Sequence, residues 1–192
     1  MKVVAFNGSA RAEGNTSLLI ETVFAPLRAA GIECEQVALR GKRLHGCIAC
    51  YKCRENQDRR CSGVNDDLNA MIEKMDEADG VIIGSPTYFA DVSAETKALI
   101  DRAGMVGLTN GGMYKRKVGA AVVAVRRGGA THTFDTINHF FFISQMIVPG
   151  SSYWNVGVGR DKGEVAEDEE GIRTMRVLGE NMAWLMERIG ER

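Results

Sequence analysis

Four cysteines lie close together in the run CIACYKCRENQDRRC, where short spacing lets their sulfur atoms converge on one centre: Cys47, Cys50, Cys53 and Cys61. Four thiolates suit a 4Fe–4S cluster, and C-x2-C-x2-C is similar to ferredoxin-type spacing. A structural zinc ion also takes four thiolates, but zinc ribbons usually bring two C-x2-C pairs from separate loops. The pattern therefore favours an iron–sulfur cluster and leaves open zinc, a disulfide pair or no metal.

Basic side chains surround these cysteines. Between residues 40 and 61 the acidic residues are Glu55 and Asp58, and the basic ones are Arg40, Lys42, Arg43, Lys52, Arg54, Arg59 and Arg60. Nearby cations favour thiolate over thiol, which suits an anionic cluster. The same charge is also consistent with a solvated loop, or with a docking patch for an acidic redox partner or a phosphorylated nicotinamide.

The loop NGSARAEGNTS, residues 7–17, has the composition of a phosphate cradle. Its candidate ligand-binding residues are Ser9, Arg11, Asn15, Thr16 and Ser17. Small residues let backbone N–H groups approach an anion, and the start of the following helix adds free N–H donors and the positive end of its dipole. The loop matches neither the Walker nor the dinucleotide-binding pattern. We therefore expect it to hold a phosphate monoester without transferring it, and an ordinary turn with a helix cap is the alternative.

Two further loops follow apolar runs. SPTYFADVS, residues 85–93, places Tyr88 and Phe89 where a flat ring would lie, after Pro86, which stiffens the entry to the loop, although its aromatic residues could also cover the core. VRRGGATHT, residues 125–133, contains Gly128 and Gly129, which permit close backbone approach, after Arg126 and Arg127, which can bind an anion or a ring oxygen. A flexible turn is the simpler interpretation of the second loop.

The segments between these loops alternate between apolar runs typical of buried strands and longer runs with helical periodicity. We expect strands at 2–6, 32–39, 80–84 and 117–125, and a fifth within 146–154. We expect helices at 15–30, 66–78, 93–104, 131–145 and 168–190. This alternation predicts an α/β fold, a flavodoxin-like doubly wound five-stranded parallel sheet with helices on both faces. For the strand order 2-1-3-4-5, a ligand binds beyond the carboxyl ends of the strands, at the switch between the first and third strands.

The bulk properties fit a single domain spanning residues 1–192. The hydrophobic content of 45% and the charged content of 26% are ordinary for a globular protein. No apolar run is long enough to span a bilayer, so we expect no membrane association, and the start of the chain has no signal-peptide pattern. A net charge of −1 without a basic stripe argues against nucleic acid. Five cysteines without a secretory signal indicate a reducing compartment, and we expect the cytoplasm.

Other residues give weaker signals. Cys34 is expected to be a buried thiol. His45, His132 and His139 share no metal-like spacing. The pair Asp66-Asp67 is interpreted as a helix cap.

The three loops together carry a resemblance. GSARAEGNTS, GSPTYFADVSAETKALIDR and RRGG resemble the flavodoxin-fold NADPH-dependent FMN reductases and multimeric flavodoxins. With the cysteine run, the chain resembles the iron–sulfur flavoprotein branch of that superfamily. The resemblance implies that the first loop holds the FMN phosphate, that residues 86–89 contact the isoalloxazine, and that Gly128 and Gly129, with Arg127 beside them, lie on its other side.

The resemblance also implies a function. We expect an FMN-dependent oxidoreductase that takes electrons from NAD(P)H or reduced ferredoxin and passes them to a quinone, a free flavin or an oxygen species. A flavodoxin-like electron carrier or redox sensor without turnover is the alternative. We expect a homodimer or homotetramer in which residues 105–114, Tyr153 and Trp154 offer apolar surface. Because the cysteine loop follows the second strand, we expect it at the same sheet edge as the flavin, with the two centres close directly or across a subunit interface.

Overall fold

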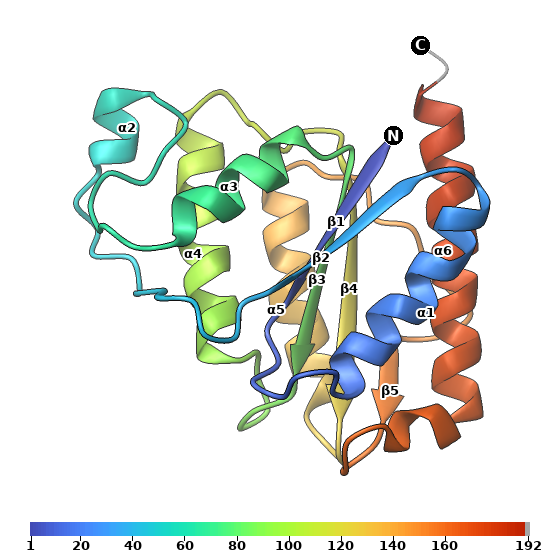
Figure 1. The fold of residues 1–192 in the computed structure, drawn as a ribbon. Coiled ribbons are helices and arrows are strands. Elements are labelled where there is room, and N and C mark those ends of the chain that lie inside the picture. The colour runs from blue at the N-terminus through green and yellow to red at the C-terminus, as the bar shows by residue number, and fades with distance from the viewer. Residues whose placement is uncertain (191–192) are drawn as a thin grey trace.

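Five parallel strands form the centre of the chain in the computed structural model, which describes residues 1–190 (Figure 1). They are β1 (Lys2–Asn7), β2 (Glu33–Ala38), β3 (Gly80–Pro86), β4 (Val118–Val125) and β5 (Val156–Val158). The order across the sheet is β2-β1-β3-β4-β5, which confirms the predicted flavodoxin-like topology. β1 therefore pairs with β2 on one side and with β3 on the other. The connections that lead to these two strands go to opposite sides of β1, which makes its carboxyl end the topological switch point.

Helices cover both faces of this sheet (Figure 1). They are α1 (Asn15–Ala29), α2 (Lys52–Asn56), α3 (Leu68–Glu77), α4 (Ala94–Thr109), α5 (Ala130–Ile143), the short 3-10 helix η1 (Glu164–Glu167) and α6 (Glu169–Gly190). α1 and α6 pack on one face, while α3, α4 and α5 pack on the other. Ser93 caps α4, because its side chain accepts a hydrogen bond from the Thr96 N–H at 3.3 Å. None of the helices within residues 1–190 has the length and apolar character required to cross a membrane.

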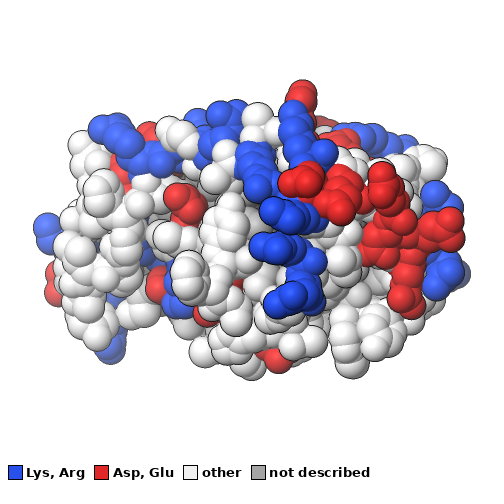
Figure 2. Space-filling model, turned by 90° about the horizontal axis from the view of Figure 1, so that it is seen from below, with Lys and Arg blue, Asp and Glu red and all other residues white. Residues whose placement is uncertain are grey.

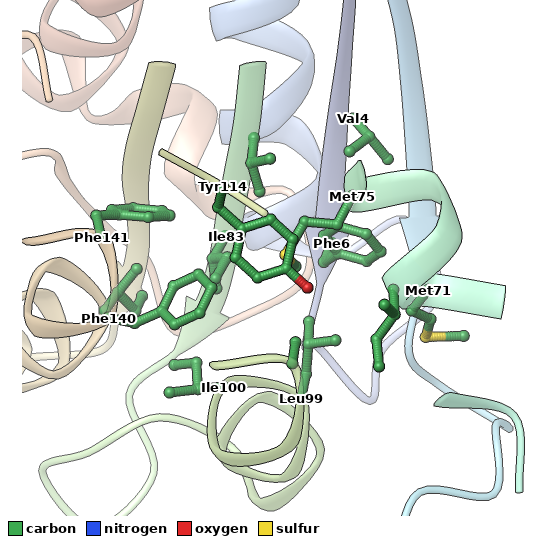
Figure 3. Packing of buried hydrophobic residues seen from close by; sticks show 14 of the residues in the cluster. Val4, Phe6, Met71, Met75, Ile83, Leu99, Ile100, Tyr114, Phe140 and Phe141 are labelled. Carbon is green, nitrogen blue, oxygen red and sulfur yellow. The ribbon is translucent and has the colours of Figure 1, made fainter. Parts of the chain in front are cut away.

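The sheet separates two apolar cores because successive side chains of a strand point to opposite faces. In β1, Val4 and Phe6 join the core under α3, α4 and α5, whereas Val3 and Ala5 join the core under α1 and α6. The first core contains a dense group of aromatic and aliphatic side chains between β3, α4 and α5 (Figure 3).

Tyr114 belongs to that core, which corrects part of the expected surface. Residues 105–114 were expected to form exposed apolar surface, but Tyr114 is 1% exposed and its ring lies 6.0 Å from that of Phe140 (Figure 3). The ring fits because Gly107 of α4 has no side chain, since a Cβ there would lie 2.5 Å from the Tyr114 ring. Leu108, by contrast, is exposed.

The fifth strand lies later in the chain than the sequence indicates. The expected segment, 146–154, forms a single bridge between Ile147 and Val118. Pro149 follows, and proline has no N–H with which to continue a ladder. The chain loops outwards and returns as β5, whose residues Val156–Val158 pair with Val123–Val125 of β4. The apolar start of the segment reflects burial of Met146 rather than strand formation.

Candidate functional site

A pocket of about 340 Å³ lies at the carboxyl edge of the sheet, within the size range of small-molecule sites. It is formed where the loops after β1, β3, β4 and β5 meet. Its lining residues are Ser9, Arg11, Asn15, Thr16, Pro86, Thr87, Tyr88, Ala124, Val125, Arg126, Gly159, Arg160 and Asp161. The pocket therefore occupies the topological switch point that the strand order predicts.

The start of α1 gives this pocket an anion-binding end. Gly14 precedes the helix and provides no side-chain cap, so the first N–H groups of α1 are left for another acceptor. Asn15 and Thr16, the first two residues of the helix, are buried and line the pocket. Ser9 is also buried and lines the pocket, and its hydroxyl accepts a hydrogen bond from the Arg11 N–H at 3.2 Å. The arrangement suits the phosphate of a monoester.

The loop after β5 closes the same end of the pocket. Arg11 Nη1 donates a hydrogen bond to the Arg160 carbonyl at 2.8 Å, and Asn15 Oδ1 accepts one from the Gly163 N–H at 2.8 Å. Sequence reasoning missed Arg160, because it placed the fifth strand too early and so did not treat the following GRD as a post-strand loop. Figure 2 views the molecule from this edge and shows a row of Lys and Arg side chains beside an acidic group. Arg11, Arg126 and Arg160 all line the pocket.

A tight turn at residues 88–91 forms the side of the pocket. Tyr88 N–H donates to the Asp91 carbonyl at 2.8 Å, and Asp91 N–H donates to the Tyr88 carbonyl at 3.1 Å. Phe89 and Ala90 at its tip have φ of +48° and +63°, values that non-glycine residues rarely adopt. Phe89 is fully exposed and does not line the pocket. Such strain is typical of functional loops held in place by their surroundings.

The third loop supports this turn from behind. Gly129 has φ of +87°, and a Cβ there would lie 2.8 Å from Ala90 Cα. Gly128 has open space around it, and Arg127 is exposed, while the neighbouring Arg126 lines the pocket. The Ser17 hydroxyl, also expected at the phosphate, donates to Gln36 Oε1 at 2.9 Å, and Ser17 is not among the lining residues of the pocket.

The four clustered cysteines surround a second pocket of about 250 Å³. Cys47 and Cys50 are exposed, Cys61 is half-buried and Cys53 is buried against the core. Gly63 allows the Cys50 sulfur to approach the backbone, because a Cβ at residue 63 would collide with it. The residues that complete the lining are Ile48, Ala49, Tyr51, Ser62, Gly63, Val64, Asp101, Arg102, Met105 and Val106.

The backbone around these cysteines is irregular. Ala49, Tyr51, Gln57 and Arg59 all have positive φ, although none is glycine. A bound inorganic group would stabilise such a loop, because strained conformations persist where surrounding contacts determine them. Within residues 1–190 no three His, Cys, Asp or Glu side chains are placed to hold a metal ion. Four sulfurs distributed around a pocket fit a polynuclear iron–sulfur cluster better than one zinc ion, whose ligands must meet at a single point.

A buried arginine lies against this cysteine pocket. Arg102 of α4 donates from Nε and Nη2 to the Cys61 sulfur at 3.3 and 3.2 Å, and from Nη1 to Asp66 Oδ2 at 2.6 Å. The side chains of Arg102 and Asp66 are each 1% exposed. Burial alone would raise the pKa of Asp66, but hydrogen bonds from Arg102 and from the His45 and Leu68 N–H groups lower that pKa to about 2.

Sequence reasoning treated Asp66 only as a helix cap. Its Oδ1 does accept a hydrogen bond from the Leu68 N–H at 3.3 Å, at the start of α3. Its second partner, Arg102, is separated from it by 36 residues, and no local pattern could have shown their contact.

The cysteine pocket lies away from the carboxyl edge. Only the first residues after β2 follow that edge, and the chain then runs back along α4 to α2 (Figure 1). Arg102 lies eight residues beyond Ala94, or about 12 Å along the helix. The two pockets share no lining residue. The expectation that both centres lie at one edge of the same chain is therefore wrong for the cysteines themselves.

The remaining sequence candidates lie outside both pockets. Cys34 is half-buried in β2, and desolvation raises the pKa of its thiol to about 11, so it stays protonated at neutral pH. His132 is exposed, with Nε2 3.6 Å from Asp91 Oδ2. His45 contacts Asp66 through Nδ1 at 3.2 Å.

This chain is similar to known proteins in both sequence and structure. The profile of the family described as NADPH-dependent FMN reductase matches residues 1–161. An iron–sulfur flavoprotein of Methanocaldococcus jannaschii is 40% identical over 196 residues, covering 98% of this chain and 99% of that protein. Among solved structures, RosB with a bound 8-demethyl-8-formylriboflavin-5′-phosphate intermediate is similar with a TM-score of 0.78 at 18% identity, covering 100% of this chain and 81% of that one. A WrbA-like flavodoxin from Agrobacterium tumefaciens has a TM-score of 0.67 at 15% identity, covering 97% of both chains. At these identities the two structures show that the fold is flavodoxin-like.

Proposed function

Because the chain belongs to the NADPH-dependent FMN reductase family, we propose that it is an oxidoreductase with FMN in the pocket at the carboxyl edge of the sheet. The observation that carries the proposal is the uncapped start of α1, which directs free N–H donors towards a pocket lined by basic residues and by Tyr88. Bound FMN would supply the redox chemistry, accepting a hydride and releasing electrons singly.

The chain's own residues would bind and orient this cofactor. Ser9, Asn15 and Thr16 would hold the phosphate together with the first N–H groups of α1, where the helix dipole favours an anion. Arg11, tied to the loop after β5, would close the phosphate end. Pro86, Thr87 and Tyr88 would lie along the ring, and the turn that carries Tyr88 is held from behind by Gly129.

We further propose that Cys47, Cys50, Cys53 and Cys61 hold a 4Fe–4S cluster. Support comes from the shared pocket, from the strained backbone around it, and from the name of the archaeal relative at 40% identity. The basic residues that flank the cysteines, such as Lys52, Arg54 and Arg60, are exposed. They would attract an acidic protein such as reduced ferredoxin to this side of the molecule.

The electron donor and acceptor are proposed from charge and access. Arg11, Arg126 and Arg160 at the flavin pocket suit the phosphates of NAD(P)H as well as that of FMN. A quinone, a free flavin or an oxygen species would accept the electrons. A non-catalytic electron carrier or redox sensor is the competing function, and steady-state oxidation of NAD(P)H by the FMN-loaded protein would separate the two.

We propose that the protein acts as a homo-oligomer, a dimer or a tetramer, in the cytoplasm. Aromatic and aliphatic residues of α5 and of the loop before β5 form an exposed apolar patch: Phe142, Ile143, Tyr153 and Trp154. Because the two pockets of one chain share no lining residue, a neighbouring subunit could bring its cysteine pocket to the flavin pocket. A sedimentation mass of a single chain at micromolar concentration would refute the oligomer.

The flavin site is tested by a pair of variants in α1. Asn15→Ala removes a pocket residue and its bond to Gly163, whereas Ser17→Ala removes a hydroxyl that donates to Gln36 outside the pocket. The first variant should bind FMN more weakly, and the second should bind it as the wild type does. If the wild type, incubated with excess FMN and desalted, retains no flavin, the proposed function is wrong.

A further inference from the structure

We infer that Arg102 is a positioning residue of the cysteine site, which fixes the Cys61 sulfur and raises the reduction potential of a cluster bound there. The inference rests on the proposed cluster and concerns a residue outside the cysteine motif. Arg102 lies 41 residues after Cys61, on α4, and reaches the sulfur through the packing of the cysteine loop on that helix.

The geometry of the contact is that of paired donation. Nε and Nη2 lie on one edge of the guanidinium and donate to the same sulfur atom at 3.3 and 3.2 Å. This is the edge with which arginine binds a carboxylate through two parallel hydrogen bonds. Within residues 1–190, Cys61 is the one member of the cysteine cluster whose sulfur accepts a hydrogen bond from a cationic side chain.

The two donors of Nη1 are already used. Nη1 donates to Asp66 Oδ2 at 2.6 Å and to the His45 carbonyl at 3.0 Å. Asp66 is itself held by the His45 N–H at 2.9 Å. Arg102 therefore has its counter-ion on one edge and Cys61 on the other. A buried ion pair is weak evidence for a purely stabilising role, and the remaining edge faces a thiol group rather than a carbonyl or a second carboxylate.

This contact would raise the reduction potential of a bound cluster. Reduction of a cluster by one electron adds one negative charge to a centre that thiolates already make anionic. Hydrogen bonds to ligand sulfurs and a fixed positive charge stabilise the reduced form more than the oxidised form, so they raise the potential. The buried position of Arg102 limits screening by solvent.

The decisive variant is Arg102→Met combined with Asp66→Asn, which removes both charges and leaves neither partner buried alone. Arg102→Lys keeps the charge but loses the paired donors. Arg59→Met is the matched control. Arg59 lies in the cysteine loop, two residues before Cys61, but donates from Nε to Asp76 Oδ2 at 3.1 Å. Each protein is reconstituted anaerobically with iron and sulfide, and FMN content, iron content and the EPR-monitored reduction potential are measured.

The double variant should have a reduction potential about 59 mV below that of the wild type. For a one-electron couple this equals an about tenfold lower ratio of reduced to oxidised cluster at a fixed applied potential. Arg102→Lys should lie between them, and Arg59→Met should match wild type. If the double variant binds FMN but no iron, the positioning role is supported, and Arg102→Lys then decides the effect on potential.

Two results would overturn the inference in distinguishable ways. A double variant with full iron content and an unchanged reduction potential would overturn the role of Arg102 but not the cluster. If the double variant holds no iron, an unchanged reduction potential in Arg102→Lys would have the same meaning. A wild type that holds no iron and sulfide would overturn it together with the cluster. FMN content reports on the flavin function separately from both.

Discussion

Replacing Gly129 by Ala should weaken FMN binding, whereas the same change at Gly128 should leave it intact. Gly129 has φ of +87°, where a residue with a Cβ is strained by about 1–2 kcal/mol. The added methyl group would also lie 2.8 Å from Ala90 Cα and 2.9 Å from Ala90 Cβ. Around Gly128, an added Cβ would meet nothing within 4 Å.

The strain at Gly129 can be relieved only by moving the turn at residues 88–91, since Ala90 contributes backbone to the clash. Overpacking of this kind costs about 1–3 kcal/mol. If about 1.4 kcal/mol of that cost is relieved in the free protein and restored when FMN binds, the dissociation constant rises about tenfold. Titration of the apoprotein with FMN, followed by flavin fluorescence, measures this change, and urea unfolding shows whether both variants remain folded. Equal dissociation constants for the two folded variants would refute the placement of the flavin ring against this turn.

Four further predictions concern buried polar groups and a thiol. Asp66→Asn should destabilise the apoprotein by about 3–5 kcal/mol in urea unfolding, because it leaves the Arg102 charge buried without its partner. Since the pKa of Asp66 falls from 3.8 to about 2 on folding, the wild type should lose about 2 kcal/mol more stability than Asp66→Asn as pH drops from about 4 to about 2. Tyr114→Phe should be neutral or slightly stabilising at the urea midpoint, because the Tyr114 hydroxyl is buried without a hydrogen-bond partner among the described residues. Cys34, whose thiol pKa is about 11, should react with iodoacetamide at pH 8 far more slowly than exposed Cys47, as peptide mapping would show.

The periodicity of the chain predicts the alternation of strands and helices and the three loops at the carboxyl edge, and the handedness of crossovers leaves few strand orders, among them the observed one. Those features depend on local patterns, such as the apolar run at 80–84 and the hydroxyl-rich loop at 7–17. The pocket gathers Ser9, Asn15, Tyr88 and their neighbours because parallel strands must end at one edge.

What the sequence could not show depends on contacts between distant segments. The sequence predicts a strand within 146–154, but Pro149 stops the pairing and β5 forms only at Val156. That error concealed Arg160. The path of the cysteine segment along α4 is set by packing and by the Arg102–Asp66 pair, whose members are 36 residues apart. Local propensity contains no information about either.

Anaerobic reconstitution of the wild type with FMN, iron and sulfide, alongside the Cys50→Ala variant, tests whether one chain holds both a flavin and an iron–sulfur cluster. Cys50 lines the cysteine pocket, which shares no residue with the flavin pocket. The wild type should bind FMN together with about four iron atoms and about four sulfide ions per chain. The variant should bind FMN but little iron. A wild type that binds FMN without iron and sulfide, or a variant that keeps the wild-type iron content, would contradict the two-centre account, and a wild type that binds no FMN would contradict the proposed function itself.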